Sequence, residues 1–275
     1  VFLFCITLKI RSLMEKKILY LLTCVGLCWS SCTNEVDEFI GNVEPSTRSV
    51  STALNANLAS LFTGGAPTLT SAEIKEVNDA YAKMTSINCY RNIDEAVRNK
   101  TSYAGTIFLD DTYASAYFRK GSLAFPPYGI LASSMEHEFI HMYQRDVQGK
   151  KVDTDKEKRD TGMMEFELAF YQGIIRYIHA GYSWTFKGED GDPSYQSLWT
   201  SGLTDPSLIP QYEREFQTYV ASICANGKPT SIDINEFVKW SNIFGEYSRG
   251  YSGKGYKFGN YDYGTSCINS LLKLY

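Results

Sequence analysis

Two of the three histidines in this 275-residue chain lie four residues apart, with a glutamate directly after the first. The segment is His137-Glu138-Phe139-Ile140-His141. Residues i and i+4 share one face of a helix, so both imidazoles can bind one metal ion while Glu138 projects beside them toward a water on that ion. The spacing therefore predicts a metal centre with His137 and His141 as ligands and Glu138 as the general base of a hydrolytic reaction.

The other cysteines and histidines bear on the kind of metal centre. A structural zinc site normally has four protein ligands, whereas a catalytic site has three and leaves one position for water. The sequence has no second cluster of Cys or His, and the next histidine, His179, comes 38 residues after His141. This favours a catalytic site that holds one Zn²⁺ per chain and takes its third ligand from a separate segment.

A glutamate on the following predicted helix is the expected third ligand, and two are available. Glu165 shares a helical stripe with Ala169, Gln172 and Arg176, whereas Glu167 lies among large apolar residues. The helical period favours Glu165 as the ligand. Glu167 is the alternative ligand, and its other possible role is that of a carboxylate at the rim of the site or behind a ligand.

These residues resemble the ligand set of the glutamate zincins, the thermolysin-like superfamily of metallopeptidases. In that superfamily the ligand glutamate commonly precedes a small residue by three or four positions, as Glu165 does with Ala169; Leu168 departs from the alanine of many relatives. The resemblance implies a zincin-like fold and a peptide or protein substrate. It also implies that zinc polarises the scissile carbonyl and lowers the pKa of its bound water to about 7, while Glu138 carries the proton to the leaving amine.

The resemblance also indicates where a substrate would bind. In zincins, the strand before the histidine helix is often the edge on which an extended peptide lies, and here that strand is expected at Ala114–Phe125. A second donor usually stabilises the developing oxyanion. Tyr251, Tyr256, Tyr261 and Tyr263 are candidates as a group, although a tyrosine-rich segment more often serves packing.

The elements that must position these residues follow from hydrophobic periodicity. A helix over Ile130–Val147, which stops at Gly149, carries the motif, and a helix over Gly162–Ala180 carries both glutamates. We expect further helices from Thr52, from Ser71, at Gln211–Ala225 and at Ile232–Tyr247, and strands at Tyr103–Asp110 and Ala114–Phe125. The fold class is α+β and mainly helical: a zincin-like domain over residues 51–275 with a small antiparallel sheet beside the motif helix.

The first 31 residues differ in character from the rest. Met14–Lys17 is charged, Ile18–Leu27 is apolar, and small residues follow, which is typical of a secretory signal over residues 14–31. The apolar run is too short to span a bilayer. Residues 1–13 precede the first methionine, and we interpret them as an over-extended gene start.

Ser30-Ser31-Cys32 resembles the end of a bacterial lipoprotein signal, in which the cysteine is lipidated; Trp29 departs from the usual aliphatic residue there. The acidic stretch after Cys32 is similar to the export tag of surface lipoproteins in Bacteroidetes-type bacteria. Residues 32–50 are polar and are expected to form a tether. The resemblance implies membrane attachment through an N-terminal lipid anchor, on the outer membrane and facing outward, with a periplasmic orientation as the alternative.

Composition excludes some partners and limits disulfide formation. The chain carries 27 Lys and Arg against 31 Asp and Glu, and it has no basic block, so nucleic acid is not an expected partner. Once the signal is removed and Cys32 is lipidated, only Cys89, Cys224 and Cys267 are left, enough for at most one disulfide.

Three functions are compatible with this sequence. A zinc metallopeptidase is favoured, because a protein that only binds has no physical need for a general base such as Glu138 between its ligands. The runner-up is a non-catalytic surface lipoprotein that binds glycan or protein on a zincin scaffold. The third is a protein that binds metal without turnover.

Overall fold

The computed structural model describes residues 53–65, 67–113, 115–127, 129–150, 159–179, 181, 207, 209–247 and 254–275. The predicted signal segment, Cys32, the tether and Tyr251 lie outside these residues. Among the residues that the structure describes, no helix is both long and apolar enough to cross a membrane.

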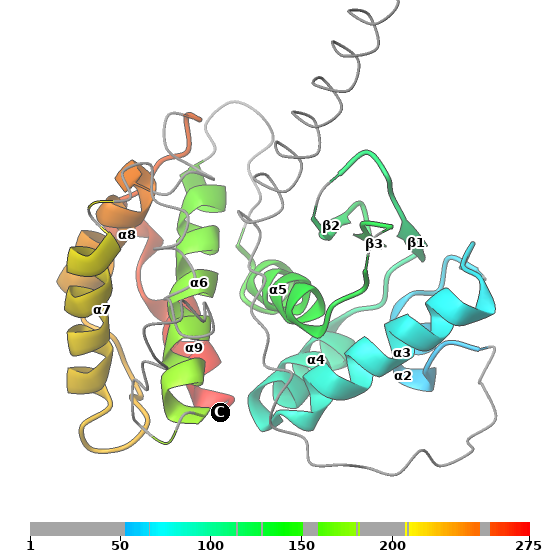
Figure 1. The fold of residues 1–275 in the computed structure, drawn as a ribbon, viewed down its shortest axis with the longest axis horizontal. Helices are drawn as coiled ribbons and strands as arrows, with labels where there is room; N and C mark the ends of the chain where they lie inside the picture. Colours follow the sequence, from blue (N-terminus) through cyan, green and yellow to red (C-terminus); the bar gives the residue numbers. More distant parts are fainter. Residues whose placement is uncertain are drawn as a thin grey trace, which may run out of the picture.

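The described chain is mainly helical with one small sheet, as the sequence predicted (Figure 1). Before and within the sheet region come α2 (Ala56–Leu61), α3 (Ser71–Ser86), α4 (Asn88–Lys100), β1 (Ile107–Leu109), β2 (Tyr117–Arg119) and β3 (Ser122–Phe125). Then follow α5 (Ala132–Met142), the π-helical turn η2 (Tyr143–Val147), α6 (Arg159–His179), α7 (Ile209–Ile223), α8 (Ile234–Tyr247), the 3₁₀ turn η6 (Tyr261–Tyr263) and α9 (Ser266–Lys273).

The sheet is mixed, so the expected antiparallel sheet was wrong in part. Its strand order is β1-β3-β2, with β1 parallel to β3 and β2 antiparallel to β3. The cause is a hairpin inside the segment Ala114–Phe125, for which the alternation of apolar and polar residues predicts a single strand. The residues Arg119–Ser122 carry no large apolar side chain, and Gly121 among them is the local sign of a turn inside this segment.

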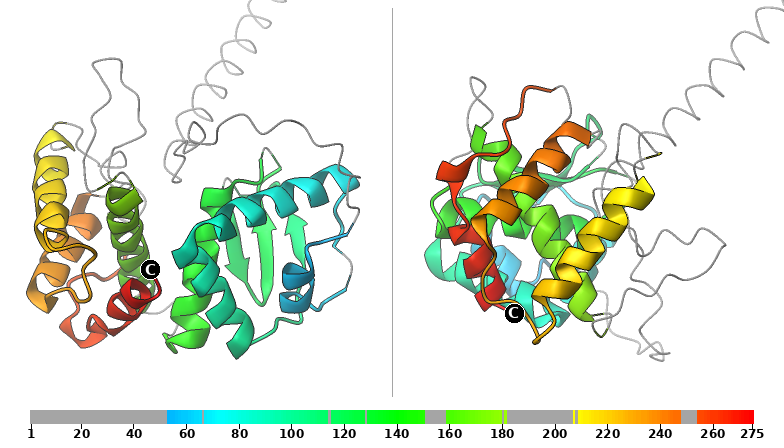
Figure 2. Two further views of the ribbon diagram at one scale, coloured as in Figure 1. Left: turned by 90° about the horizontal axis from the view of Figure 1, so that it is seen from below. Right: turned by 90° about the vertical axis from the view of Figure 1, so that its left-hand side faces the viewer.

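The hairpin turn consists of Lys120 and Gly121, which both have positive φ, 51° and 77° respectively. Two successive residues with positive φ are the mark of the tight turns whose twist matches that of paired strands. Glycine adopts this conformation without steric strain, whereas lysine does not. The turn makes β3 the central strand and leaves β2 at the edge that faces α5 (Figure 2).

α5 lies between two parts of the molecule. On one side it packs against α3, α4 and β2, and on the other against α6, which in turn packs against α7, α8 and α9 (Figure 1). Met135 and Phe139 of α5 are fully buried. Phe166 and Phe170 of α6 stack at 5.4 Å between ring centroids, and Phe170 also contacts Phe216 of α7. One continuous hydrophobic core therefore holds α5 and α6 in a fixed relation.

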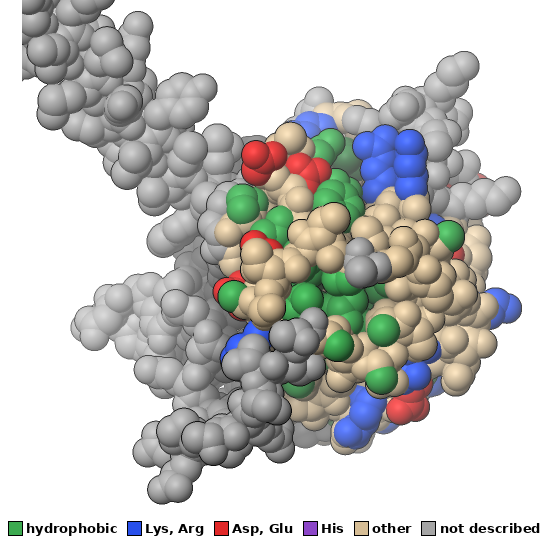
Figure 3. Space-filling model, turned by 90° about the vertical axis from the view of Figure 1, so that its right-hand side faces the viewer, with side chains coloured by type: hydrophobic (Ala, Val, Ile, Leu, Met, Phe, Trp, Pro, Cys, Tyr) green, Lys and Arg blue, Asp and Glu red, His purple; other side chains and the backbone are tan. Residues whose placement is uncertain are grey.

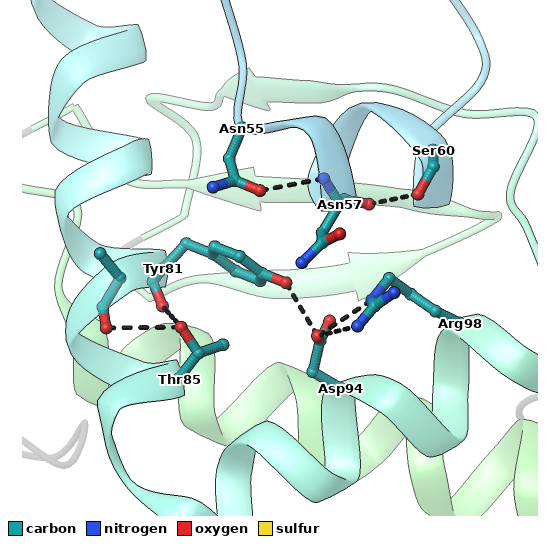
Figure 4. A network of polar contacts seen from close by, with 8 residues as sticks. Asn55, Asn57, Ser60, Tyr81, Thr85, Asp94 and Arg98 are labelled. Carbon is teal, nitrogen blue, oxygen red and sulfur yellow. Dashed lines mark hydrogen bonds and ion pairs between the residues drawn. The ribbon is translucent and has the colours of Figure 1, made fainter.

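A buried polar network fixes α3 against α4 (Figure 4). The Tyr81 hydroxyl donates to the Asp94 carboxylate at 2.8 Å, and Arg98 forms an ion pair with the same carboxylate at 2.9 Å. Asp94 is only 1% exposed, so these two partners compensate for much of the cost of burying its charge.

On the face in Figure 3, hydrophobic side chains gather near the centre and most Lys and Arg side chains lie toward the margin.

Cys89, Cys224 and Cys267 are buried free thiols in the core, so the described part of the chain contains no disulfide between them.

Candidate metal centre

The helix α5 presents both histidines on one face. Its buried residues Met135, Phe139 and Met142 anchor the opposite face in the core. His137 and His141 are partly exposed, and their ring centroids lie 4.7 Å apart at an interplanar angle of 80°. Leu131, which lies inside the helix expected over Ile130–Val147, instead precedes the helix and is 45% exposed.

Glu165 of α6 meets the two histidines. The His137 and His141 Nε2 atoms are 3.1 Å apart, and the Glu165 carboxylate oxygens lie 3.6 Å from His137 Nε2 and 3.3 Å from His141 Nε2. One ligand atom from each residue lies within 4.8 Å of the others. Of the two glutamates considered from sequence, Glu165 is therefore the one that the structure brings to the histidines.

The spacing of these atoms fits a zinc ion. Two neutral imidazole nitrogens and one carboxylate are a known ligand set of catalytic zinc, with metal–ligand distances near 2.0–2.2 Å. In a tetrahedral site of that size, neighbouring ligand atoms are separated by about 3.3–3.6 Å. The two Nε2 atoms are 3.1 Å apart, close to this range, and each lies at a similar distance from a different oxygen of Glu165: His141 Nε2 is 3.3 Å from Oε1 and His137 Nε2 is 3.6 Å from Oε2.

The electrostatics of His137, His141 and Glu165 favour a cation between them. Burial lowers the pKa of His137 to about 4, and the neighbouring His141 lowers it further. Burial would also lower the pKa of His141, but the Glu165 carboxylate, together with Glu138 and Gln144, outweighs burial and raises that pKa to about 9. His137 is thus neutral, whereas Glu165 attracts positive charge to its histidine neighbours, and a divalent cation would be favoured at the same point.

Glu138 lies beside this cluster without belonging to it. Its side chain is 5% exposed, and burial raises its pKa to about 8. It interacts electrostatically with His141 and Glu165, and the backbone N–H of Phe118 in β2 donates to its carboxylate. The carboxylate is therefore held between the edge strand and the candidate ligands.

Glu167 points away from the histidines into a separate polar network. It is fully buried, and its oxygens accept hydrogen bonds from Gln144 Nε2 at 3.0 Å, Tyr263 Oη at 2.8 Å and the backbone N–H of Ile268 at 2.6 Å. Burial raises its pKa, while these donors oppose that effect. Both oxygens are thus already bound by the protein.

The tyrosine candidates occupy different environments. Tyr263 is buried on Glu167, Tyr261 is 58% exposed, and Tyr256 is partly buried near enough to Glu165 for that carboxylate, together with burial, to raise its pKa. Among the described tyrosine candidates, Tyr256 is thus the one that interacts electrostatically with Glu165. His179 lies at the end of α6 against the ring of Tyr275, away from the cluster.

Sequence reasoning did not identify two contacts of the site. The Phe118 backbone N–H on Glu138 carries no sequence signal, because any residue but proline supplies it. Gln144 hydrogen-bonds His141 Nδ1 at 2.8 Å. Its position three residues after His141, within the helix expected over Ile130–Val147, was a usable signal for this contact.

Comparison with family models, with curated proteins and with solved structures gave no match. The residues of the site therefore carry the functional interpretation. The zincin resemblance rests on the motif His137–His141 and on Glu165.

Proposed function

We propose that this protein is a zinc-dependent metallopeptidase in which His137, His141 and Glu165 hold one Zn²⁺ and Glu138 is the general base. The observation that supports it most is the convergence of three ligand atoms within 4.8 Å beside a buried fourth residue, Glu138, that can carry a proton. A purely structural zinc site would use a fourth protein ligand. Here the described ligand group has three members, as expected for a site that leaves room for water.

The reaction divides between the ion and the chain. Bound zinc would supply Lewis acidity, which polarises a carbonyl and makes water a better nucleophile at neutral pH. Glu138 would accept a proton from the attacking water and deliver it to the amine that leaves. Its burial favours the protonated form between these two transfers, because burial disfavours a charged carboxylate.

The strand β2 is the proposed position of the substrate backbone. It is an edge strand, it packs against α5, and its Phe118 contacts the general base. An extended peptide can add to such an edge through main-chain hydrogen bonds. A peptide bound there would pass beside Glu138, which favours peptides over compact substrates.

The cellular setting is proposed from the sequence. A lipid on Cys32 would anchor the chain to the outer membrane, with the domain facing outward. The tether over residues 32–50 would let the domain move up to roughly 65 Å from the anchor if fully extended.

The decisive experiment combines zinc analysis with peptide cleavage. Purified full-length protein is expected to contain zinc near one equivalent and to cleave members of a mixed peptide library. Glu138→Gln is expected to keep its zinc and to lose cleavage by about 10²–10⁴-fold. Glu136→Gln, the same isosteric change two residues earlier on α5, serves as the matched control and should retain both.

The outcomes separate the alternatives. Stoichiometric zinc without cleavage by the wild type would favour a protein that binds metal, glycan or protein without turnover. A wild type without zinc would rule out the metal centre.

A further inference from the structure

The orientation of the Gln144 side chain is fixed by its neighbours. Its Nε2 atom lies 2.9 Å from the carbonyl oxygen of Met164 and 3.0 Å from Glu167 Oε2. A backbone carbonyl only accepts hydrogen bonds, so the amide nitrogen must face it. The amide oxygen Oε1 therefore faces His141 Nδ1, at 2.8 Å.

This orientation determines which nitrogen of His141 is available to bind a metal ion. Because Gln144 Oε1 can only accept, His141 Nδ1 must carry a hydrogen. The other nitrogen, Nε2, faces His137 and Glu165. In the neutral imidazole that nitrogen presents its lone pair to the candidate metal position, which is the form that a metal ligand requires.

Glu167 connects this arrangement to the C-terminal part of the chain. Its Oε2 accepts from Gln144 and from the Tyr263 hydroxyl, and its Oε1 accepts from the backbone N–H of Ile268. Ile268 lies in the first turn of α9, and the side chain of the N-cap residue Thr265 accepts no hydrogen bond from a backbone N–H of that turn. Glu167 thus caps α9 from a neighbouring helix, where a carboxylate is favoured by the helix dipole.

We propose that Gln144 and Glu167 are positioning residues for His141, and that Tyr263 and the first turn of α9 support the metal centre by holding Glu167 in place. The inference rests on the proposed zinc site. It assigns the buried carboxylate of Glu167 a role other than metal binding, and it makes the segment from Tyr261 to Lys273 necessary for tight zinc binding. Partners behind a metal-bound histidine typically change metal affinity 10–100-fold.

Two phenol groups in this protein offer a matched test. Tyr263 donates to Glu167 and Tyr81 donates to Asp94, each from a buried ring at 2.8 Å. Tyr263→Phe and Tyr81→Phe therefore delete the same kind of bond. Both full-length variants should show a similarly lowered unfolding midpoint, but only Tyr263→Phe should raise the zinc dissociation constant, by about tenfold.

A second measurement reads the position of the hydrogen on His141. In zinc-loaded wild type, the Nδ1 hydrogen of His141 should give a slowly exchanging signal in ¹H–¹⁵N spectra, because Gln144 shields it. Gln144→Met, which has similar length and no amide, should make that hydrogen exchange faster. It should also raise the zinc dissociation constant 10–100-fold.

The results distinguish this inference from the proposed function. If wild type binds zinc and neither Tyr263→Phe nor Gln144→Met binds it more weakly, the positioning role is overturned and the metallopeptidase proposal stands. Equal weakening by Tyr263→Phe and Tyr81→Phe would reduce the effect to general stability and would also overturn it. A wild type that binds no zinc would overturn both. If Gln144→Met does not fold, the tyrosine pair decides alone.

Discussion

The three candidate ligands are brought together in two ways. His137 and His141 are brought together by one helical turn, so their proximity is a property of the local sequence. Glu165 comes from another helix, and its placement depends on the packing of α6 against α5. Glu167, two residues later, faces away because two residues on a helix differ by about 200° in direction.

The two glutamates should therefore respond differently to substitution. Glu165→Ala removes a ligand, and we expect the purified protein to lose stoichiometric zinc. Glu167→Gln leaves all three candidate ligands in place, so saturating zinc should still give one equivalent. It keeps the shape of the side chain but places an amide among three hydrogen-bond donors. The second variant should lose about 1–3 kcal/mol of unfolding free energy. Zinc analysis and urea denaturation measure the two effects; loss of zinc by Glu167→Gln alone would reverse the assignment.

The helices were more accessible to sequence reasoning than the sheet. The helix over Ile130–Val147 appears as α5 and its π-helical continuation, because a long apolar stripe has a clear period. α4 received no prediction. The sheet was misjudged because periodicity shows that a strand exists but not which neighbour it pairs with. The side-chain network around Glu167 depends on three distant segments, and no local pattern encodes it.

The hairpin between β2 and β3 gives a prediction at the scale of one element. Gly121 has φ of 77°, so Gly121→Ala should destabilise the protein by about 1–2 kcal/mol. Lys120→Gly relieves a similar strain at φ of 51° but adds freedom to the unfolded chain. Its effect should stay within about 1 kcal/mol of zero. Urea denaturation of both variants checks the pair, and an equal loss in both would argue against this turn.

At the scale of the whole molecule, the candidate site joins two parts of the fold. The histidines lie on α5, which packs against β2, α3 and α4, whereas Glu165 lies on α6, which packs against α7, α8 and α9. A ligand held by both helices stabilises the folded state in proportion to its binding, by about 4 kcal/mol at a thousandfold excess over Kd. Zinc would therefore act as a cross-link between α5 and α6.

Metal removal should accordingly lower the stability of the whole chain. Thermal unfolding of the wild type is expected at a lower midpoint after treatment with a chelator, and added zinc should restore it. His141→Ala, which lacks one ligand, should unfold at the same temperature with and without chelator. A chelator effect of equal size in His141→Ala would show that the stabilising metal lies elsewhere.

The central claim is that Glu138 acts as a general base beside a zinc ion. The most direct measurement is cleavage of a mixed peptide library by zinc-loaded wild type and by zinc-loaded Glu138→Gln, with zinc content determined in the same samples. We predict cleavage by the wild type, a loss of about 10²–10⁴-fold in the variant, and equal zinc in both. Equal cleavage by the two proteins, or none by a wild type that holds its zinc, would contradict it.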